Sequence, residues 1–351
     1  MRKVWRTVVG VVAVVVVAAA GFLGVATVTE YDPPAVEDVL VTGEAVDALA
    51  PGASVTLLTF NIGYAGLGEG QDFFLDGGEM VRPDSKAVIE TNLAGVAGQA
   101  AAAAADIYLF QEVDTDAHRS YGVNEYALLS AGLGGAATFA YNFKSLYTPY
   151  PWPPIGHVES GLLTLSRYPV AEASRIALPV PFTWPVRLFN LKRALLVDRI
   201  GLTGSERDLV VVNLHLEAYE DGSGRAAQTA QLLDFIADEY AQGNYVIAGG
   251  DFNQTFPGVD YPAVSTAWQP GVLDASAIAA LGEGWTIAHD AATPTCRLND
   301  HPLTTEGPVQ YFGIDGFITS PNVTVEHVTT LDGGFAYADH NPVQVTVTLA
   351  A

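Results

Sequence analysis

From residue 54 onward, short apolar runs alternate with polar segments and with two longer helical stretches. The runs are rich in Val, Ile, Leu and aromatic residues, and turn or polar residues bound each of them, as is typical of buried strands. Strands are expected at 55–60, 107–110, 161–165, 194–200, 209–214, 245–248, 314–319 and 343–349. Helices are expected at 84–105, capped by Asp84 or Ser85, and at 225–240. This alternation predicts a layered α/β or α+β domain.

The beginning of the chain has a different pattern. Residues 8–28 form an uncharged, almost wholly apolar run behind three bases, Arg2, Lys3 and Arg6. A helix of that length spans roughly 30 Å, the thickness of a bilayer core, whereas the apolar stretch of a signal peptide has only about 7–15 residues. Residues 1–30 are therefore expected to be a retained membrane anchor, and small residues in the run keep a cleaved signal peptide as the alternative.

The bases before this run also predict its orientation. By the positive-inside rule the basic end stays in the cytoplasm, and everything after Glu30 lies outside it. The expected location is the cell membrane, with a single span and the main domain outside the cytoplasm. If the segment is cleaved, the domain is secreted.

Two other segments interrupt the alternation. Residues 31–53 are acidic and broken by Pro and Gly, which predicts a linker before a single domain at 54–351. Residues 143–190 interleave aromatic residues with prolines, at a density that prevents regular helix and favours rigid loops. Such loops either pack onto the domain, form a wall of a substrate cleft, or make an apolar surface that touches lipid.

Charge narrows the range of partners. The 351 residues include 39 Asp and Glu against 16 Lys and Arg, a formal net charge of −23. Affinity for nucleic acid depends largely on Lys and Arg that neutralise phosphates, so a general nucleic-acid-binding surface is disfavoured. The single cysteine, Cys296, excludes an intrachain disulfide and a cysteine-based zinc cluster.

Candidate chemistry lies where polar residues end the apolar runs. Burial of many carboxylates and amides is costly unless they pair or bind a cation, and a hard divalent metal with oxygen ligands would explain them together. Each residue alone could be a cap, a turn residue or an ordinary core residue. The residues at these six ends are Asn61, then Glu112, then Asn213 and His215, then Asp251 and Asn253, then Asp315, and last Asp339 and His340.

The ordered set F-N-I-G, Q-E-V-D, N-L-H-L, G-G-D-F-N, I-D-G-F and D-H-N-P-V resembles the endonuclease/exonuclease/phosphatase superfamily, over about residues 54–350. That superfamily includes pancreatic-type deoxyribonuclease, apurinic endonucleases, inositol-phosphate 5-phosphatases and sphingomyelinases. The resemblance implies an α/β (α+β) four-layer sandwich, in which two mixed β-sheets lie face to face and helices flank them. It also implies a metal-dependent hydrolase that acts on phosphoester bonds.

The resemblance further implies a metal site. Glu112 would hold Mg²⁺, or else Mn²⁺ or Ca²⁺, with Asn61 and Asp339 assisting. Asp251 would orient or deprotonate the attacking water, and Asn253 would hold a phosphate oxygen. Such a set is chemically coherent because a cation and amide donors neutralise an anionic phosphoester under attack.

Two histidines complete the implied site. His340, paired with Asp315, would contact the scissile phosphate, and His215 would steady the phosphate or the leaving oxygen. Arg193 and Lys192 are either surface ion-pair residues or contacts to the phosphate or headgroup of the substrate.

The substrate class follows from the anchor, the aromatic loops and the acidic charge. These features favour an extracytoplasmic phosphodiesterase or phosphatase acting on a lipid headgroup or a small phosphoester. The alternatives are a secreted or surface-anchored nuclease and, third, a catalytically silent binding module of the same fold.

Overall fold

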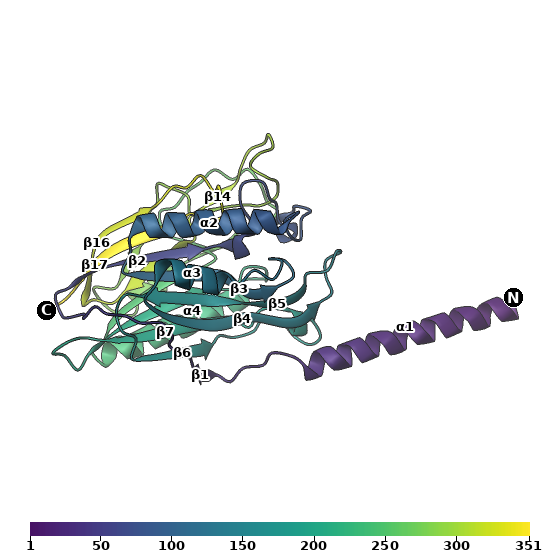
Figure 1. Ribbon diagram of the computed structural model, residues 1–351, viewed down its shortest axis with the longest axis horizontal. Coiled ribbons are helices and arrows are strands. Elements are labelled where there is room, and N and C mark those ends of the chain that lie inside the picture. Colours follow the sequence, from purple (N-terminus) through teal and green to yellow (C-terminus); the bar gives the residue numbers. More distant parts are fainter.

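The computed structural model describes residues 1–351, and two β-sheets packed face to face form its centre (Figure 1). Both sheets are mixed, because β2–β3 and β8–β9 pair in parallel while the other neighbours are antiparallel. The larger sheet has seven strands, in the order β1 (Val36–Asp38), β6 (Glu172–Ala177), β7 (Ala194–Gly201), β8 (Asp208–His215), β9 (Tyr245–Asp251), β15 (Asp315–Thr319) and β12 (Thr286–Ala288). The other has six, in the order β16 (Val323–Thr330), β17 (Val343–Leu349), β2 (Ser54–Asn61), β3 (Ile107–Ala117), β5 (Gly156–Ser166) and β4 (Ala136–Thr148).

Helices cover the outer face of each sheet. Ile89 and Leu93 of α2 (Lys86–Ala103) share a buried cluster with Phe110 of the six-stranded sheet, and α3 (Glu125–Leu133) adds Leu129 to it. On the other side, Leu232 of α4 (Ser223–Ala241) belongs to the cluster over the seven-stranded sheet. The result is the predicted four-layer sandwich, which is thereby confirmed.

Short elements complete the chain. They are η1 (Gly63–Ala65), η2 (Phe74–Asp76), η3 (Val186–Phe189) and α5 (Ala275–Ala279), with the small strand pairs β10 (Gln254–Thr255) with β11 (Gly271–Val272), and β13 (Cys296–Arg297) with β14 (Tyr311–Phe312).

Central strands are apolar on both faces because each face packs against another layer. Val55 and Leu57 of β2 point into the core between the sheets, whereas Leu58 and Phe60 of the same strand point toward α2. Successive strand residues face opposite sides, so a strand with two covered faces has an unbroken apolar sequence. This explains why the apolar runs mark the central strands so clearly.

Polar side chains also connect the two sheets through the core. Gln111 of β3 donates from Nε2 to Asn213 Oδ1 of β8 at 2.8 Å, and Asn213 Nδ2 donates to the carbonyl oxygens of Phe110 and Leu163, both at 3.1 Å. Both the oxygen and the nitrogen of the Asn213 side chain therefore form hydrogen bonds between the sheets. It belongs to the framework that holds the sheets together.

A second such connection joins Thr138 of β4 to Asp198 of β7. Thr138 Oγ1 donates to both carboxylate oxygens of Asp198 at 2.9 Å. Burial raises the pKa of Asp198 to about 7, although the hydrogen bond from Thr138 opposes this effect. The folded-state pKa of Asp198 lies above the ordinary value. The contribution of Asp198 to the stability of the fold is therefore fully present below about pH 4 and is lost as the pH rises through 7.

The variant Asp198→Asn should remove this loss of stability. An amide stays neutral, so the variant is expected to be more stable than wild type at pH 8, by up to about 4 kcal/mol, and to show little gain at pH 4.5. Thermal unfolding at the two pH values measures the difference. The exposed Asp234→Asn on α4 is the matched control, and a gain that is equal at both pH values would contradict the account.

Helix α1 (Arg2–Val28) projects from the end of the sandwich opposite to the C-terminus (Figure 1). It is long and apolar enough to span a membrane, and none of its residues is buried. Residues 31–53, predicted as a linker, connect α1 to β2 and run along the sandwich. They contribute the edge strand β1, and Leu49 is buried where it bridges to Leu202.

Candidate active site

One cavity of about 300 Å³ opens at the end of the sandwich from which α1 projects. Strand β2 begins beside the C-terminal strand, with Ser54 opposite Thr348, so Asn61 at its other end lies on the α1 side. Since β3 runs parallel to β2, its polar residues reach the same end. The structure places seven of the eight predicted site residues in the cavity wall, and the eighth lies directly behind one of them. The seven are Asn61, Glu112, His215, Asp251, Asn253, Asp339 and His340.

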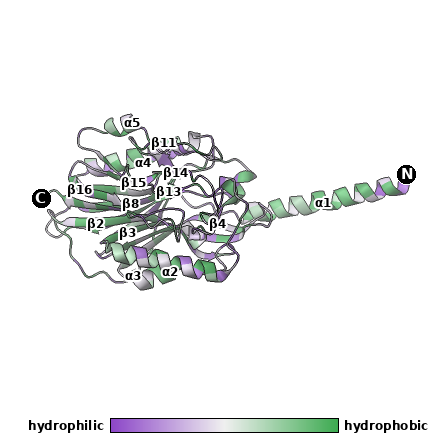
Figure 2. Cartoon of the chain, turned by 90° about the horizontal axis from the view of Figure 1, so that it is seen from above, coloured by the Kyte–Doolittle hydropathy of each residue, from purple (hydrophilic) through white to green (hydrophobic).

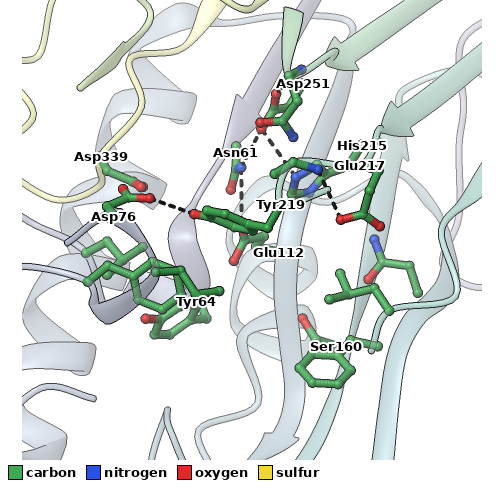
Figure 3. A pocket seen from close by; sticks show the side chains of 18 of the residues that line it. Asn61, Tyr64, Asp76, Glu112, Ser160, His215, Glu217, Tyr219, Asp251 and Asp339 are labelled. Carbon is green, nitrogen blue, oxygen red and sulfur yellow. Dashed lines mark hydrogen bonds and ion pairs between the residues drawn. The ribbon is translucent and has the colours of Figure 1, made fainter. Parts of the chain in front are cut away.

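Asn61 lies at the centre of this group (Figure 3). Its Nδ2 donates to Asp251 Oδ2 at 3.0 Å and to Glu112 Oε1 at 3.3 Å, and it lies 3.5 Å from His340 Nε2. Its own Oδ1 accepts from the backbone of Gly63 at 3.0 Å. The single amide thus connects residues from four distant parts of the chain, which explains why its position at a strand end matters.

Glu112 reaches the cavity through an irregularity in β3. Pairing with β5 shifts register between Phe110 and Val113, and Glu112 has a φ of 54°. A left-handed conformation is unfavourable for a residue with a side chain, and such strain is concentrated at functional sites. A bulge of this kind redirects the side chain of the bulged residue, in this case toward Asn61.

Arg119 also faces Glu112, and the sequence reasoning missed it. Arg119 Nη2 lies 2.8 Å from Asp114 Oδ1, Nη1 lies 3.9 Å from Glu112 Oε2, and the guanidinium lies 3.8 Å over the ring of Tyr64. The available signal was that only 16 bases occur in a strongly acidic chain. In a chain with so few bases, each Arg and Lys is a candidate partner for the carboxylates of the site.

His340 and Asp315 form a buried pair, with His340 Nδ1 2.8 Å from Asp315 Oδ2. Burial lowers the pKa of His340, but the charge of Asp315, its hydrogen bond to the ring and the neighbouring Cys296 together outweigh burial and raise the pKa well above its ordinary value. The backbone N–H of Asp315 donates to Thr295 Oγ1 at 3.2 Å. His340 is therefore protonated at neutral pH, and its Nε2 faces Asp251 Oδ2 at 3.8 Å.

Asp251 is held from several sides. Its Oδ1 accepts from the backbone of Asn253 at 2.8 Å, and its Oδ2 lies 3.4 Å from His215 Nε2. Burial, with the charge of Asp315 adding, raises the pKa of Asp251 to about 7. Burial and the nearby charge of Arg193 lower the pKa of His215 well below its ordinary value, so the two histidines of the site differ in charge.

Asp339 supplies an observation that bears on a metal. Its Oδ2 accepts from Asn299 Nδ2 at 2.6 Å, but its buried Oδ1 has no hydrogen-bond partner. Burial raises the pKa of Asp339, and the nearby charge of Glu112 adds to the effect. The carboxylates of Glu112 and Asp339 repel each other, and the buried Oδ1 of Asp339 is free. Together they offer hard oxygen donors that fit a divalent cation.

A second group of possible ligands consists of Asp251, Asp315 and His340, whose ligand atoms lie within 4.8 Å of one another. These atoms already form the His340–Asp315 pair and face Asp251. His340 Nδ1 in this group is already paired with Asp315 Oδ2, whereas the buried Asp339 Oδ1 has no partner. The group consisting of Asn61, Glu112 and Asp339 therefore fits a cation better.

The glycines before Asp251 have a different role from the one that their sequence suggests. Gly249-Gly250 in the G-G-D-F-N motif is the kind of pair that lets backbone approach a ligand closely. In the structure, a Cβ on Gly249 would collide with the ring of Phe317, and one on Gly250 with the carbonyl oxygen of Leu214. The glycines therefore allow close packing within the sandwich.

Four further polar residues extend the site. Arg193 is 4% exposed, and its Nε lies 3.7 Å from Glu217 Oε2, yet its Nε and Nη1 make no hydrogen bond. Tyr219 donates its hydroxyl to Asp76 Oδ1 at 2.7 Å (Figure 3), and burial raises the pKa of Asp76 to about 6. All four of these residues line the same cavity.

The family model of the endonuclease/exonuclease/phosphatase family matches residues 58–340, which include all eight predicted site residues. The chain belongs to this family. The family resemblance inferred from the motifs is thereby confirmed. Members of the endonuclease/exonuclease/phosphatase family are metal-dependent hydrolases of phosphoester bonds, and this chain is such an enzyme.

Solved structures of low sequence identity share the fold. An endonuclease/exonuclease/phosphatase from Beutenbergia cavernae is 19% identical, with a TM-score of 0.59 over 85% of this chain and 72% of that one. TDP2 from Caenorhabditis elegans is 16% identical, with a TM-score of 0.52 over 86% and 76% of the two chains. A family protein from Bacteroides vulgatus is 17% identical, with a TM-score of 0.52 over 85% and 99%. No curated protein sequence matches this chain significantly.

Proposed function

We propose that this enzyme is anchored in the cell membrane by residues 1–30 and hydrolyses the phosphoester of a lipid headgroup outside the cytoplasm. In this proposal residues 31–53 connect the anchor to a catalytic domain at 54–351. The observation that carries the proposal is the composition of the cavity wall. Its polar end holds the predicted site residues, and its remaining wall is strongly aromatic. The aromatic residues of the cavity lining are Tyr64, Phe73, Phe74, Phe143, Phe182, Phe189, Tyr219 and Trp268.

Helix α1 supports retention of the anchor because it makes specific contacts with the folded domain. Phe22 stacks on Phe189 with ring centroids 5.7 Å apart, and Trp184 Nε1 donates to Thr27 Oγ1 at 3.1 Å. A segment that is removed during export has no role in the folded protein and needs no such contacts.

In the proposed metal site, Glu112, Asn61 and Asp339 would hold Mg²⁺. When bound, the cation neutralises charge on the phosphate and polarises the bond that breaks. Asn299 donates to Asp339 Oδ2 and so orients the free Oδ1 of that carboxylate. Arg119, held by Asp114, balances part of the negative charge at Glu112.

The remaining residues act on the phosphate and on water. Protonated His340, fixed by Asp315, donates from Nε2 to a phosphate oxygen and stabilises the charge that develops there. Asp251, with a pKa near neutrality, accepts the proton of the attacking water. Asn253 uses one amide hydrogen on the Leu216 carbonyl at 2.9 Å and has the second available for a phosphate oxygen.

His215 and Arg193 line the same cavity as Asp251 and the proposed metal ligands. Neutral His215 steadies the phosphate or the leaving oxygen. Arg193 has two buried donors without partners, and a phosphate oxygen would satisfy them. A hydrogen bond between charged groups contributes about 1.5–3 kcal/mol, so Arg193 should matter for substrate affinity.

The variant Arg193→Ala is accordingly expected to lower kcat/KM by roughly 10- to 100-fold, mainly through a higher KM. Steady-state rates with bis(p-nitrophenyl) phosphate measure the change. Arg193→Ala/Glu217→Gln tests whether an unpaired Glu217 contributes to the loss, and the exposed Arg207→Ala is the matched control. An unchanged kcat/KM in both Arg193 variants would remove this role.

The lipid substrate is tested by headgroup release. Full-length protein with Mg²⁺ is given vesicles that contain phosphatidylcholine, phosphatidylglycerol and phosphatidylinositol, and in parallel supercoiled plasmid. We expect metal-dependent release of phosphate or headgroup and no nicking. Plasmid cleavage without lipid turnover would contradict the proposal and favour the nuclease alternative, which the acidic net charge of −23 disfavours.

A further inference from the structure

Aromatic and aliphatic side chains are exposed around the C-terminal end of α1. They belong to the segments 145–158 and 176–191, which flank the entrance of the cavity. We call them the rim: Tyr147, Tyr150, Trp152, Trp184 and Val186, with Trp152 88% exposed. Figure 2 shows the apolar helix α1 continuing into this part of the domain. Large aromatic residues rarely remain in water without a partner, and Trp and Tyr are typical of membrane interfaces.

The position of α1 identifies the partner of the rim. Phe22 of the helix contacts Tyr147 edge-on with centroids 6.3 Å apart, and Trp184 binds Thr27 near the helix end. Lys192 Nζ lies 3.1 Å from Glu30 Oε1, just beyond the helix. Tyr147 and Trp184 of the rim therefore lie beside the final two turns of α1.

Helix geometry gives the depth of these contacts. Phe22 lies six residues before the end of α1 at Val28, so it is about 9 Å below that end along the helix axis. The interfacial layer on each side of a bilayer is about 5–8 Å thick. When α1 spans a bilayer, the residues that contact Phe22 lie at the boundary between headgroups and hydrocarbon.

The charge distribution agrees with this depth. The chain has 39 acidic residues, yet neither 145–158 nor 176–191 contains one. Transfer of a carboxylate from water into an apolar layer is very costly, so a surface that enters lipid must lack carboxylates. A surface that stays in water has no such restriction.

The rim is continuous with the wall of the cavity. Val186 belongs to both, and Tyr150 packs edge-on against Phe74 of the wall, with centroids 6.1 Å apart. Phe189, which stacks on Phe22 of α1, also lines the cavity. An apolar path therefore leads from the membrane helix to the polar end of the site.

We propose that the rim inserts into the membrane leaflet around the C-terminal end of α1, so that lipid enters the cavity directly from that leaflet. The insertion rests on the membrane anchor of the proposed function, and the entry of substrate rests in addition on its lipid substrate. The partner that covers the rim is a phospholipid bilayer. The enzyme therefore acts on the same membrane that holds its own anchor.

Fluorescence depth measurements on the full chain test the insertion. Trp152→Cys is labelled with the fluorophore NBD, and the protein is reconstituted in vesicles of phosphatidylcholine and phosphatidylglycerol that carry nitroxide lipids. Cys296 is buried, so the unsubstituted chain gives the labelling background. Glu206→Cys, exposed in the β7–β8 turn at the opposite end of the sandwich, is the matched control.

We expect strong quenching by the nitroxide lipids at position 152 and none at position 206. Equal, weak quenching at both positions would overturn the insertion. This result does not depend on catalysis, so a failure of the proposed lipid hydrolysis cannot be mistaken for a failure of the insertion.

A second measurement tests the entry of lipid. Trp152→Ser should lower headgroup release from the same vesicles by about tenfold, because membrane contact scales with buried apolar area, and should leave hydrolysis of bis(p-nitrophenyl) phosphate unchanged. Wild-type rates on both substrates in this variant would overturn the entry route. A wild-type enzyme that hydrolyses only the soluble ester would instead overturn the proposed lipid substrate.

Discussion

Replacement of His340 with Ala is expected to lower the turnover of any phosphoester substrate by roughly 10³- to 10⁴-fold. His340 is a buried cation beside Asp251, because its pair with Asp315 raises its pKa and keeps it protonated at neutral pH. The variant loses the donor that stabilises charge on the phosphate, and this loss is specific to the transition state. Single-turnover rates with bis(p-nitrophenyl) phosphate at saturating Mg²⁺ measure it.

The control for this variant is His327→Ala, since His327 is an exposed histidine on β16, outside the cavity. It should keep wild-type turnover. Circular dichroism and the Tm of His340→Ala establish that the fold survives. Turnover within a few fold of wild type in a folded His340→Ala protein would remove the role assigned to this residue.

Loss of the metal is expected to have a similar effect. Dialysis against EDTA should lower turnover by roughly 10³-fold or more, since a bound cation contributes several kcal/mol of charge stabilisation, and added Mg²⁺ should restore it. Glu112→Gln should shift the Mg²⁺ dependence to much higher concentration, because the amide lacks the charge of the carboxylate. Rates measured across a Mg²⁺ titration show both effects.

Glu326→Gln, on the exposed side of β16, is the matched control and should keep the wild-type Mg²⁺ dependence. If the EDTA-treated enzyme stayed fully active, or if Glu112→Gln left the Mg²⁺ titration unchanged, Glu112 could not be the principal metal ligand.

The sequence predicted the central strands well, and the reason is their burial on both faces. The expected strand 209–214 is β8 (Asp208–His215), and the expected helix 225–240 is α4 (Ser223–Ala241). Peripheral strands were missed. Strand β4 (Ala136–Thr148) mixes Ala, Thr, Asn and Lys, because one of its faces is partly open and it forms the edge of its sheet. An edge strand needs no continuous apolar run.

The segment 143–190 illustrates the limit of local patterns. Its prolines indicated the loops at 149–155 and 178–191, and the apolar run 161–165 indicated β5 (Gly156–Ser166), but β6 (Glu172–Ala177) was missed. Likewise, Val36–Asp38 in the predicted linker becomes the strand β1 only because β6 offers a free edge. Tertiary partners far along the chain determine such elements.

Within the site, strand ends identified the residues that converge, and local patterns could not identify their support. Asn299, which holds Asp339, and Arg119, which faces Glu112, occur in loops and carry no periodic signal. The conformation of Glu112 likewise depends on a bulge against β5 that only the pairing of strands reveals.

The central claim is that side chains from distant parts of the chain hold one divalent cation at the end of the sandwich. A crystal of the protein soaked in Mn²⁺ tests it directly, through anomalous difference density. The account predicts one strong peak among Asn61, Glu112 and the free Oδ1 of Asp339, lost in Glu112→Gln. Density for Mn²⁺ only elsewhere in the molecule, or an unchanged peak in that variant, would contradict the account.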